Sequence, residues 1–309
     1  MCYIQNRALF RSFNLPPLNL NLNENLGFMN ISHHTSHIPW PKLIVLWSIH
    51  GDEPSGTIAW MKFREILANG QLILVKWSIT IITHCNQAAF TQWVRSIDKN
   101  LNRCFQENNL GESYEDWLAR SIMIHLKEHD YLLDLHSTSW KSIPFMFCEK
   151  SNLQFAQQLL VSHLILGWWE RQTVWMRWDT ESFMNSIWKM GFTFEAWNHN
   201  APEWADNAYQ AILNFVSALW LIAPKLSIAI GWTYPVIVSI DWVYTAKSEN
   251  WNFAIKHTEN FYRLNRGDLI GYDDTIPIYS DKDSILLLPK WYRPKIWEEI
   301  FFYGSTQSA

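Results

Sequence analysis

The 309-residue sequence has no long hydrophobic run and no closely paired cysteines, and we expect no secretory signal. No stretch approaches the roughly eighteen apolar residues that a membrane-spanning helix needs, so we expect no membrane partner. The N-terminal residues are rich in asparagine and lack the compact apolar core of a secretory signal. The four cysteines are widely spaced and form no CxxC pair, which favours free thiols in a reducing compartment. We therefore expect a cytoplasmic protein.

The sequence also lacks a large excess of charged residues of one sign. The 25 basic and 29 acidic residues leave a formal net charge of -4 and no basic run is present, so a nucleic-acid partner is not expected. P-loop, GxGxxG and GxSxG motifs are also absent, which leaves nucleotide binding and serine-nucleophile catalysis without support. The 48% of hydrophobic residues indicates a globular chain long enough for about two domains.

Glycine is scarce and tryptophan is abundant, with 11 and 20 residues respectively, whereas glycine usually makes up about 7% of a protein. Several tryptophans stand in turn-like surroundings where glycine usually supplies a positive φ, as at residues 250–252 (NWN) and 296–298 (IWE). We hypothesise that the source organism reads UGA as glycine, and that these codons were translated as tryptophan. The alternative is a truly tryptophan-rich protein, for example one with aromatic carbohydrate-binding surfaces.

Hydrophobic patterning predicts alternating strands and helices over most of the chain. Strands are expected at 42–49, 72–83, 131–135 and 191–196, and helices at 54–67, 112–129, 152–166 and 202–221. This alternation indicates an α/β fold, with a mostly parallel mixed sheet covered by helices on both faces. Short β-like runs separated by turns follow. The predicted division is an irregular lead-in (1–40), an α/β domain (41–223) and a small all-β domain (224–309).

The strongest local signal is the sequence His-Gly-Asp-Glu at the end of the first predicted strand. His50 and Glu53 lie three residues apart and can bind one metal ion, with Gly51 permitting a tight backbone bend. His136, at the end of another predicted strand, is the natural third ligand, because a catalytic zinc usually has three protein ligands and one open position. Strand ends in such sheets gather at one edge, where functional groups are found.

Two further features carry candidate chemistry. Arg95 and Arg103 lie eight residues apart, and together with Asn102 they could grip a carboxylate and polarise a carbonyl group. A solvated loop is the alternative interpretation of this segment. Glu195 lies at the end of an apolar strand, where a carboxylate is costly to bury unless it has a use.

Taken together, these motifs resemble the succinylglutamate desuccinylase and aspartoacylase family, which belongs with the zinc carboxypeptidase-like hydrolases. The matching motifs, in order, are HGDE (50–53), NLNRCF (100–105), DLHST (134–138) and FTFEA (192–196). The resemblance extends over about residues 42–221, and the β-rich tail is similar to the C-terminal domain of that family. It implies one Zn²⁺ per chain, bound by His50, Glu53 and His136.

The resemblance also implies a reaction and a role for each residue. The reaction would be hydrolysis of the amide bond of an N-acyl amino acid, or a related small molecule, by zinc-activated water. Glu195 would be the general base and Arg95 would polarise the scissile carbonyl. Asn102 and Arg103 would hold a substrate carboxylate, and Tyr292 would close over the substrate.

Some positions depart from the family pattern. Asn100 stands where the family usually has aspartate, which removes a carboxylate near the substrate arginines. Asn185 stands about ten residues before the general base, where aspartoacylases have an arginine, and the nearest arginine here is Arg177. The acyl group and the amino acid therefore stay open. Trp47 and Trp197 stand where the family commonly has glycine, which favours the glycine hypothesis.

Two other functions are compatible with these residues. One is a metallocarboxypeptidase that acts on peptides or cell-wall fragments and would have an open groove. The other is a non-catalytic zinc-binding or carbohydrate-binding protein, which would expose stacked tryptophans. The expected partner in the favoured interpretation is a small molecule that bears a carboxylate, and homo-oligomerisation is left open.

Overall fold

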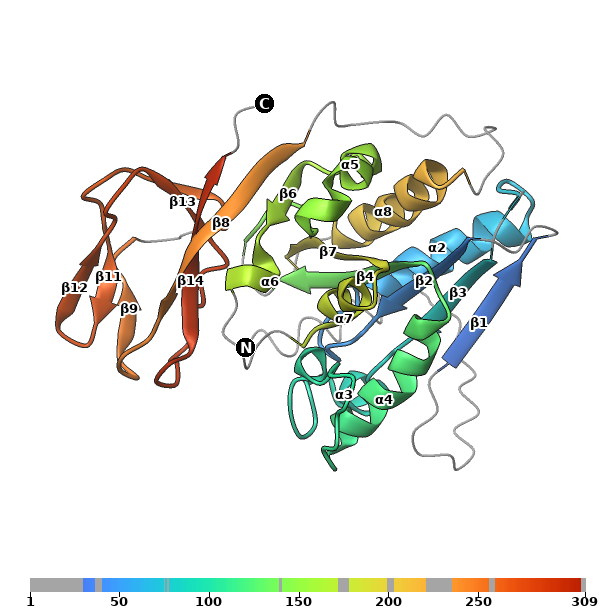
Figure 1. Cartoon of the computed structure of the whole chain (residues 1–309), viewed down its shortest axis with the longest axis horizontal. Coiled ribbons are helices and arrows are strands. Elements are labelled where there is room, and N and C mark those ends of the chain that lie inside the picture. Colours follow the sequence, from blue (N-terminus) through green and yellow to red (C-terminus); the bar gives the residue numbers. More distant parts are fainter. Residues whose placement is uncertain are drawn as a thin grey trace.

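An eleven-stranded sheet runs through the protein, whose structure is a computed structural model (Figure 1). The structure describes residues 30–36, 41–74, 76, 78–138, 141–171, 178–198, 203–220, 235–255 and 259–306. In spatial order the strands are β1 (Asn30–Thr35), β3 (Ser78–Thr83), β2 (Lys42–Trp47), β4 (Tyr131–Thr138), β7 (Met190–Asn198), β5 (Phe145–Phe147), β6 (His163–Leu166), β8 (Val236–Thr245), β14 (Glu299–Thr306), β13 (Ser284–Leu287) and β10 (Tyr262–Leu264).

The central strands are parallel and buried on both faces. β3, β2, β4 and β7 pair in parallel, as do β5, β6 and β8, while β1 and β5 are antiparallel to their neighbours β3 and β7. In β2, Leu43 and Val45 pack into one core, and Ile44 and Leu46 pack into the other. Successive side chains of a strand point to opposite faces, so a continuous apolar run requires cover on both sides. The predicted α/β class is confirmed.

Helices supply this cover (Figure 1). α2 (Ser55–Ala68) and α8 (Trp204–Ala218) pack against each other and contribute to the core that contains Leu43. α4 (Tyr114–Lys127) and α7 (Thr180–Ser186) contribute to the core on the opposite face. The remaining helical segments are short: α3 (Gln87–Gln92), the 3₁₀ turns at Leu101–Arg103, Lys150–Asn152 and Gln157–Leu159, α5 (Leu153–Ala156) and α6 (Trp168–Arg171). No helix within the described ranges is long and apolar enough to cross a membrane.

The C-terminal region is built of strands, as expected. β8, β14, β13 and β10 extend the large sheet in antiparallel pairing. A second sheet contains β12 (Ile276–Tyr279), β11 (Leu269–Asp273) and β9 (Trp251–Phe253). Because β8 also pairs with β6, the large sheet continues from the α/β part into this region. The predicted division at residue 224 lies in a segment outside the described residues and stays a prediction.

Two local predictions are wrong. The helix expected at 152–166 is limited to a few short turns that end at Leu160, where φ is 55°, and residues 163–166 form β6 instead. Those four residues lie between β5 and β8, and a run so short does not reveal its period in the sequence. The lead-in expected to be irregular contains β1, whose pairing with β3 was not visible in its polar sequence. The first 29 residues lie outside the described part of the chain.

Tryptophans occupy backbone conformations that suit glycine. Among the described residues, eleven non-glycine residues have a positive φ, and five of these are tryptophans. They are Trp93, Trp188, Trp197, Trp220 and Trp297. A left-handed conformation costs an L-residue about 1–2 kcal/mol but costs glycine little. This distribution favours the glycine hypothesis, which stays a hypothesis about the gene.

A matched pair of variants tests the hypothesis at the level of stability. Trp188 is 97% exposed with a φ of 63°, whereas Trp117 is 45% exposed and lies within α4. We expect Trp188→Gly to stabilise the protein by up to about 1 kcal/mol, since strain is removed and almost no contact is lost. Trp117→Gly should destabilise it by about 1 kcal/mol, because glycine is unfavourable inside a helix. Urea unfolding measures both, and equal losses in the two variants would count against the hypothesis.

Candidate metal centre and active site

His50, Glu53 and His136 converge at one edge of the sheet. His50 and Glu53 lie in the turn that follows β2, and His136 lies on the adjacent parallel strand β4. One ligand atom from each lies within 4.8 Å of the others, and all three residues are buried. Glu53 bridges the pair, with Oε1 at 2.8 Å from Nδ1 of His50 and Oε2 at 2.9 Å from Nδ1 of His136. The turn needs Gly51, because a Cβ there would lie 2.1 Å from the backbone of Ala89.

The outer nitrogens of the two histidines have oxygen partners. Nε2 of His50 lies 2.9 Å from Oδ1 of Asn100, and Nε2 of His136 lies 3.0 Å from Oδ2 of Asp134. Thr180 donates its hydroxyl to the same Asp134 oxygen at 2.5 Å. At His50 the oxygen acceptor at Nε2 fixes the proton there and leaves Nδ1 available to a metal ion. The donor set, two imidazoles and a carboxylate, therefore fits zinc with one coordination position left for water.

Burial and mutual charge determine how these groups ionise without metal. Burial alone would raise the pKa of Glu53, but His50 and His136 hold it well below its usual value. Burial opposes protonation of His136, yet Asp134 and Glu53 raise its pKa well above 6.5. Burial, together with the charge of Arg95, lowers the pKa of His50. Without metal, Asp134 and Glu53 therefore favour the protonated form of His136, and metal binding at His136 competes with that proton.

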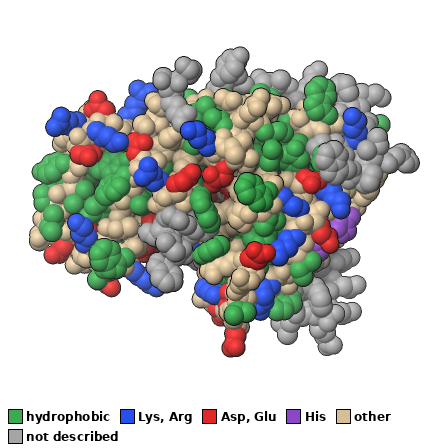
Figure 2. Space-filling view, in the orientation of Figure 1, with side chains coloured by type: hydrophobic (Ala, Val, Ile, Leu, Met, Phe, Trp, Pro, Cys, Tyr) green, Lys and Arg blue, Asp and Glu red, His purple; other side chains and the backbone are tan. Residues whose placement is uncertain are grey.

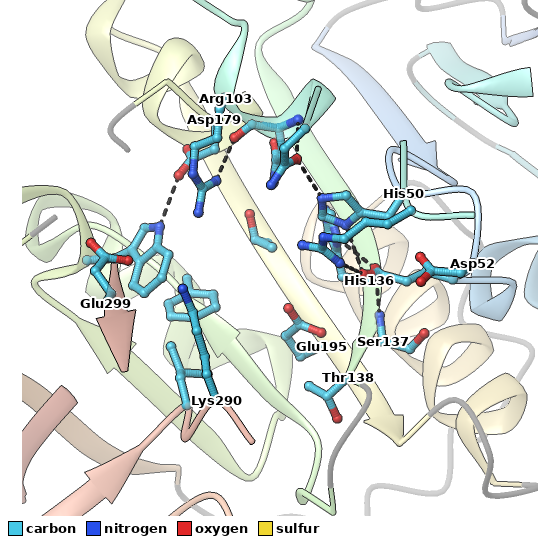
Figure 3. A pocket seen from close by; sticks show the side chains of 18 of the residues that line it. His50, Asp52, Arg103, His136, Ser137, Thr138, Asp179, Glu195, Lys290 and Glu299 are labelled. Atoms are coloured by element: carbon cyan, nitrogen blue, oxygen red, sulfur yellow. Dashed lines mark hydrogen bonds and ion pairs between the residues drawn. The ribbon is translucent and has the colours of Figure 1, made fainter. Parts of the chain in front are cut away.

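Glu195 and Arg95 line the same cavity as the triad, and Figure 3 shows Glu195 beside His136. Glu195 lies on β7 directly opposite His136 of β4, and its carboxyl group points into the cavity. Its Oε2 has no hydrogen-bond partner among the described residues, and burial raises its pKa to about 8. Arg95 is about half exposed, and its Nη1 donates to Oε1 of Glu53 at 2.8 Å.

The 3₁₀ turn Leu101–Arg103 positions the second cluster. The Asn100 side chain caps this turn by accepting from the backbone of Asn102 at 2.9 Å. Oδ1 of Asn102 accepts from the backbone of Thr180, which ties the turn to α7. Arg103 donates from Nη1 to the backbone oxygen of Asn102 at 2.6 Å and lines the same cavity. Burial lowers the pKa of Arg103, whereas the negative charge of Asp179 acts to raise it.

One cavity of about 430 Å³ contains all the site residues named from the sequence. Its lining residues from the C-terminal region are Leu288, Lys290, Tyr292, Glu298, Glu299 and Phe302. Tyr292 is about half exposed, and its hydroxyl donates to Oε1 of Glu298 at 2.5 Å. The β-rich tail therefore forms one wall of the site. Sequence reasoning missed Lys290 and Glu299 here, since neither belongs to a recognisable motif.

Two departures from the family pattern take on a different meaning in three dimensions. Asn100 contacts His50, so its missing charge bears on the His–Glu–His triad more directly than on the arginines. Asn185 lies near the end of α7 and bonds to Asn152 and Gly191, and it does not line the cavity. Arg177 lies outside the described residues. The α7 residue that does reach the cavity is its N-cap, Asp179.

We expect Asn100→Asp to tighten metal binding by about tenfold. A carboxylate is a stronger acceptor for the Nε2 proton of His50 than an amide oxygen, and outer partners of this kind change metal affinity about 10- to 100-fold. Competition with a chelator at fixed pH measures the affinity. Asn108→Asp, on an exposed loop nearby, adds the same charge away from His50 and serves as the control. Equal affinities in all three proteins would contradict the prediction.

Fold and donor set together define an α/β protein with a buried His–Glu–His triad that could hold a metal ion. The sequence profile of the succinylglutamate desuccinylase/aspartoacylase catalytic domain matches residues 39–196, just over half of the chain. The protein belongs to this family. It is 35% identical over 107 residues to a "probable aspartoacylase" of Trichodesmium erythraeum, a segment that makes up 32% of this chain and 36% of that protein.

Solved structures agree on the fold. A succinylglutamate desuccinylase from Vibrio cholerae superposes with a TM-score of 0.72 at 17% identity, covering 89% of this chain and 85% of the other. A succinylglutamate desuccinylase/aspartoacylase from Rhodobacter sphaeroides gives a TM-score of 0.70 at 16% identity, covering 91% and 90%. Both alignments cover more of this chain than its α/β part alone.

Proposed function

We propose that this protein is a zinc-dependent deacylase that hydrolyses the amide bond of an N-acyl amino acid or a related small carboxylate. One arrangement carries the proposal: the His50–Glu53–His136 triad lies beside the buried carboxyl group of Glu195 in a cavity that also contains Arg103. The names of the related proteins, desuccinylase and aspartoacylase, describe the removal of acyl groups from amino acids and support the same class of reaction.

The triad would hold one zinc ion per chain. Zinc bound there would act as a Lewis acid and lower the pKa of a water toward about 7. Three protein donors in a buried edge of the sheet, each histidine oriented by an outer oxygen, are what such an ion requires.

Glu195 would transfer protons. Its unpartnered oxygen faces the cavity next to His136, where it can accept a proton from the attacking water and return it to the leaving amine. Burial raises the pKa of its carboxyl group to about 8, which favours the second step, donation to the amine. The group therefore suits both halves of the reaction near neutral pH.

The arginines would bind the substrate. Arg95, at the mouth of the triad, would donate to the oxygen of the scissile carbonyl as negative charge develops there. Arg103, whose guanidinium lies deeper in the cavity, would pair with the carboxylate of the amino acid, helped by the amide of Asn102. Tyr292, on the tail, would narrow the entrance.

The shape of the site argues against the two alternatives. A carboxypeptidase acting on long chains needs an open groove, whereas the tail walls this cavity, whose volume of about 430 Å³ suits a small molecule. A carbohydrate-binding surface needs neighbouring exposed aromatics. On the face in Figure 2 the apolar side chains are spread among charged ones, and none of the exposed tryptophans in the described ranges stacks on another. A cytoplasmic location remains part of the proposal, favoured by the buried free thiols Cys85, Cys104 and Cys148.

A substrate panel tests the proposal. Zinc-loaded protein, prepared both as written and with glycine at all 20 tryptophan positions, is incubated with N-acetyl and N-succinyl amino acids and with short peptides. We expect release of free amino acid from at least one N-acyl compound, and loss of this activity after chelation. Cleavage of peptides alone would favour the carboxypeptidase, and a zinc-loaded protein that cleaves none of these compounds would refute the deacylase.

A further inference from the structure

The end of the cavity away from the triad contains a buried acidic group with an unused oxygen. Glu299 is the first residue of β14, and its backbone pairs with Thr245 of β8. Its side chain lines the cavity although the residue is only 1% exposed. Its Oε1 has no hydrogen-bond partner among the described residues. In Figure 3, Glu299 lies across the cavity from His50. Lys290 and Arg103 lie between these two residues, nearer to Glu299.

A buried carboxylate oxygen without a donor is unfavourable by about 1–3 kcal/mol in a folded protein. Glu299 lies close enough to Arg103 and Lys290 for its charge to raise the pKa of both. Neither residue, however, donates a hydrogen bond to Oε1 of Glu299. Such a group in a native structure calls for a partner, for example a water, an ion or a bound ligand. Because Glu299 lies in the wall of the cavity, a bound substrate can supply the missing donor.

The other acidic groups at this end of the cavity are already engaged. Asp179 accepts from the backbone of Ser182 at 2.7 Å and from the indole of Trp168 at 3.0 Å. Glu298 accepts from the hydroxyl of Tyr292 and from the backbone of Lys295. Glu299 is thus the acid with a spare acceptor in this part of the described structure.

The glycine hypothesis does not weaken this assignment. A glycine at position 168 would remove the indole donor from Asp179 and leave its Oδ2 as a second acceptor close to the cavity. The acidic character of the distal end would then increase. Both forms of the protein therefore present the same kind of subsite.

We propose that Glu299 binds a protonated amine of the substrate, so that the preferred substrates are N-acyl amino acids whose side chain ends in an amine. This inference rests on the proposed deacylase function. Arg103 pairs with the carboxylate, Glu195 and Arg95 face the amide, and Glu299 accepts from the ammonium group. A dicarboxylic substrate would instead place a second carboxylate against Glu299 and Asp179, which is unfavourable in a buried site.

Three N-acetyl compounds of matched chain length test the subsite. The three side chains have the same number of carbons: in Nα-acetylornithine the last carbon carries an amine, in Nα-acetylnorvaline it is a methyl group with no amine, and in Nα-acetylglutamate it is a carboxylate. We expect kcat/KM for the ornithine compound to exceed that for the norvaline compound by about 10- to 100-fold, the usual range for a hydrogen bond to a charged group. Glu299→Gln should abolish this ratio, Glu299→Asp should retain much of it, and Glu299→Lys should shift the preference to the glutamate compound.

Glu249→Gln is the matched control, since it removes the same charge from an exposed position of the C-terminal region. It should leave the ratio unchanged. Circular dichroism and zinc content of each variant establish that it is folded. The subsite would be wrong if the unaltered protein hydrolysed the three compounds equally and Glu299→Gln did not change their ratio. The proposed deacylase activity would be unaffected by that result.

A binding measurement separates failure of the subsite from failure of the deacylase. Calorimetry on the zinc-loaded Glu195→Gln variant compares free ornithine, norvaline and glutamate as ligands. Tighter binding of ornithine that disappears in the Glu195→Gln, Glu299→Gln double variant supports the subsite even if no acyl compound is hydrolysed. Tighter binding of glutamate would overturn it.

Discussion

Replacing Glu195 by glutamine should lower kcat by about 10²- to 10⁴-fold while zinc content stays unchanged, the usual contribution of a positioned acid–base group. The amide of glutamine is nearly isosteric with the carboxyl group but can neither take a proton from water nor return one to an amine. Glu195 faces the cavity from β7 and contributes no atom to the triad, so metal binding should survive. Steady-state kinetics on the best N-acyl substrate, together with metal analysis, measure both quantities.

Glu112→Gln, on the exposed loop before α4, is the control and should behave like the unaltered protein. A Glu195→Gln variant with nearly full activity would rule out its role as the general base. Loss of zinc together with activity would mean instead that the side chain supports the metal centre.

Replacing His136 by alanine should abolish both zinc binding and activity. The substitution removes one of three ligand atoms and leaves Glu53 and Asp134 facing each other without the imidazole that both contact. Ligand binding stabilises a folded protein by about 2.7 kcal/mol at a hundredfold excess over Kd. We therefore expect zinc to raise the melting temperature of the unaltered protein, and to leave that of His136→Ala unchanged.

His125→Ala removes a histidine of α4 that is not part of the triad, and its melting temperature should still respond to zinc. A zinc-induced shift that persists in His136→Ala would place the metal elsewhere. If His136→Ala kept its activity, the reaction would not depend on zinc bound at this triad, and that part of the proposed function would be wrong.

The triad could be located from the sequence because its histidines lie at the ends of strongly apolar segments that form buried strands. β2 and β4 are buried on both faces, so their sequences are continuous hydrophobic segments that end at His50 and His136. Parallel neighbours end at the same edge of a sheet, and the two histidines must therefore lie close together. The same argument places Glu195, at the end of β7, beside them.

Sequence spacing was a poor guide where the chain turns back on itself. Asn185 stands where aspartoacylases have an arginine, but the short helix α7 carries it away from the cavity and presents Asp179 instead. Asn100 replaces an aspartate expected near the substrate arginines, yet its side chain contacts His50. In both cases the direction of a side chain depends on a turn whose geometry is not encoded by distance along the chain.

The sequence by itself determined the α/β class, the family and the identity of the groups that converge at the strand ends, because apolar periodicity and strand-end motifs are local signals. Tertiary structure alone decided which residues form the opposite wall. Lys290 and Glu299 reach the cavity because β14 pairs with β8 and β8 pairs with β6, contacts between segments far apart in the chain. The charge at that wall, which we expect to select the substrate, arises from long-range strand pairing that no local pattern records.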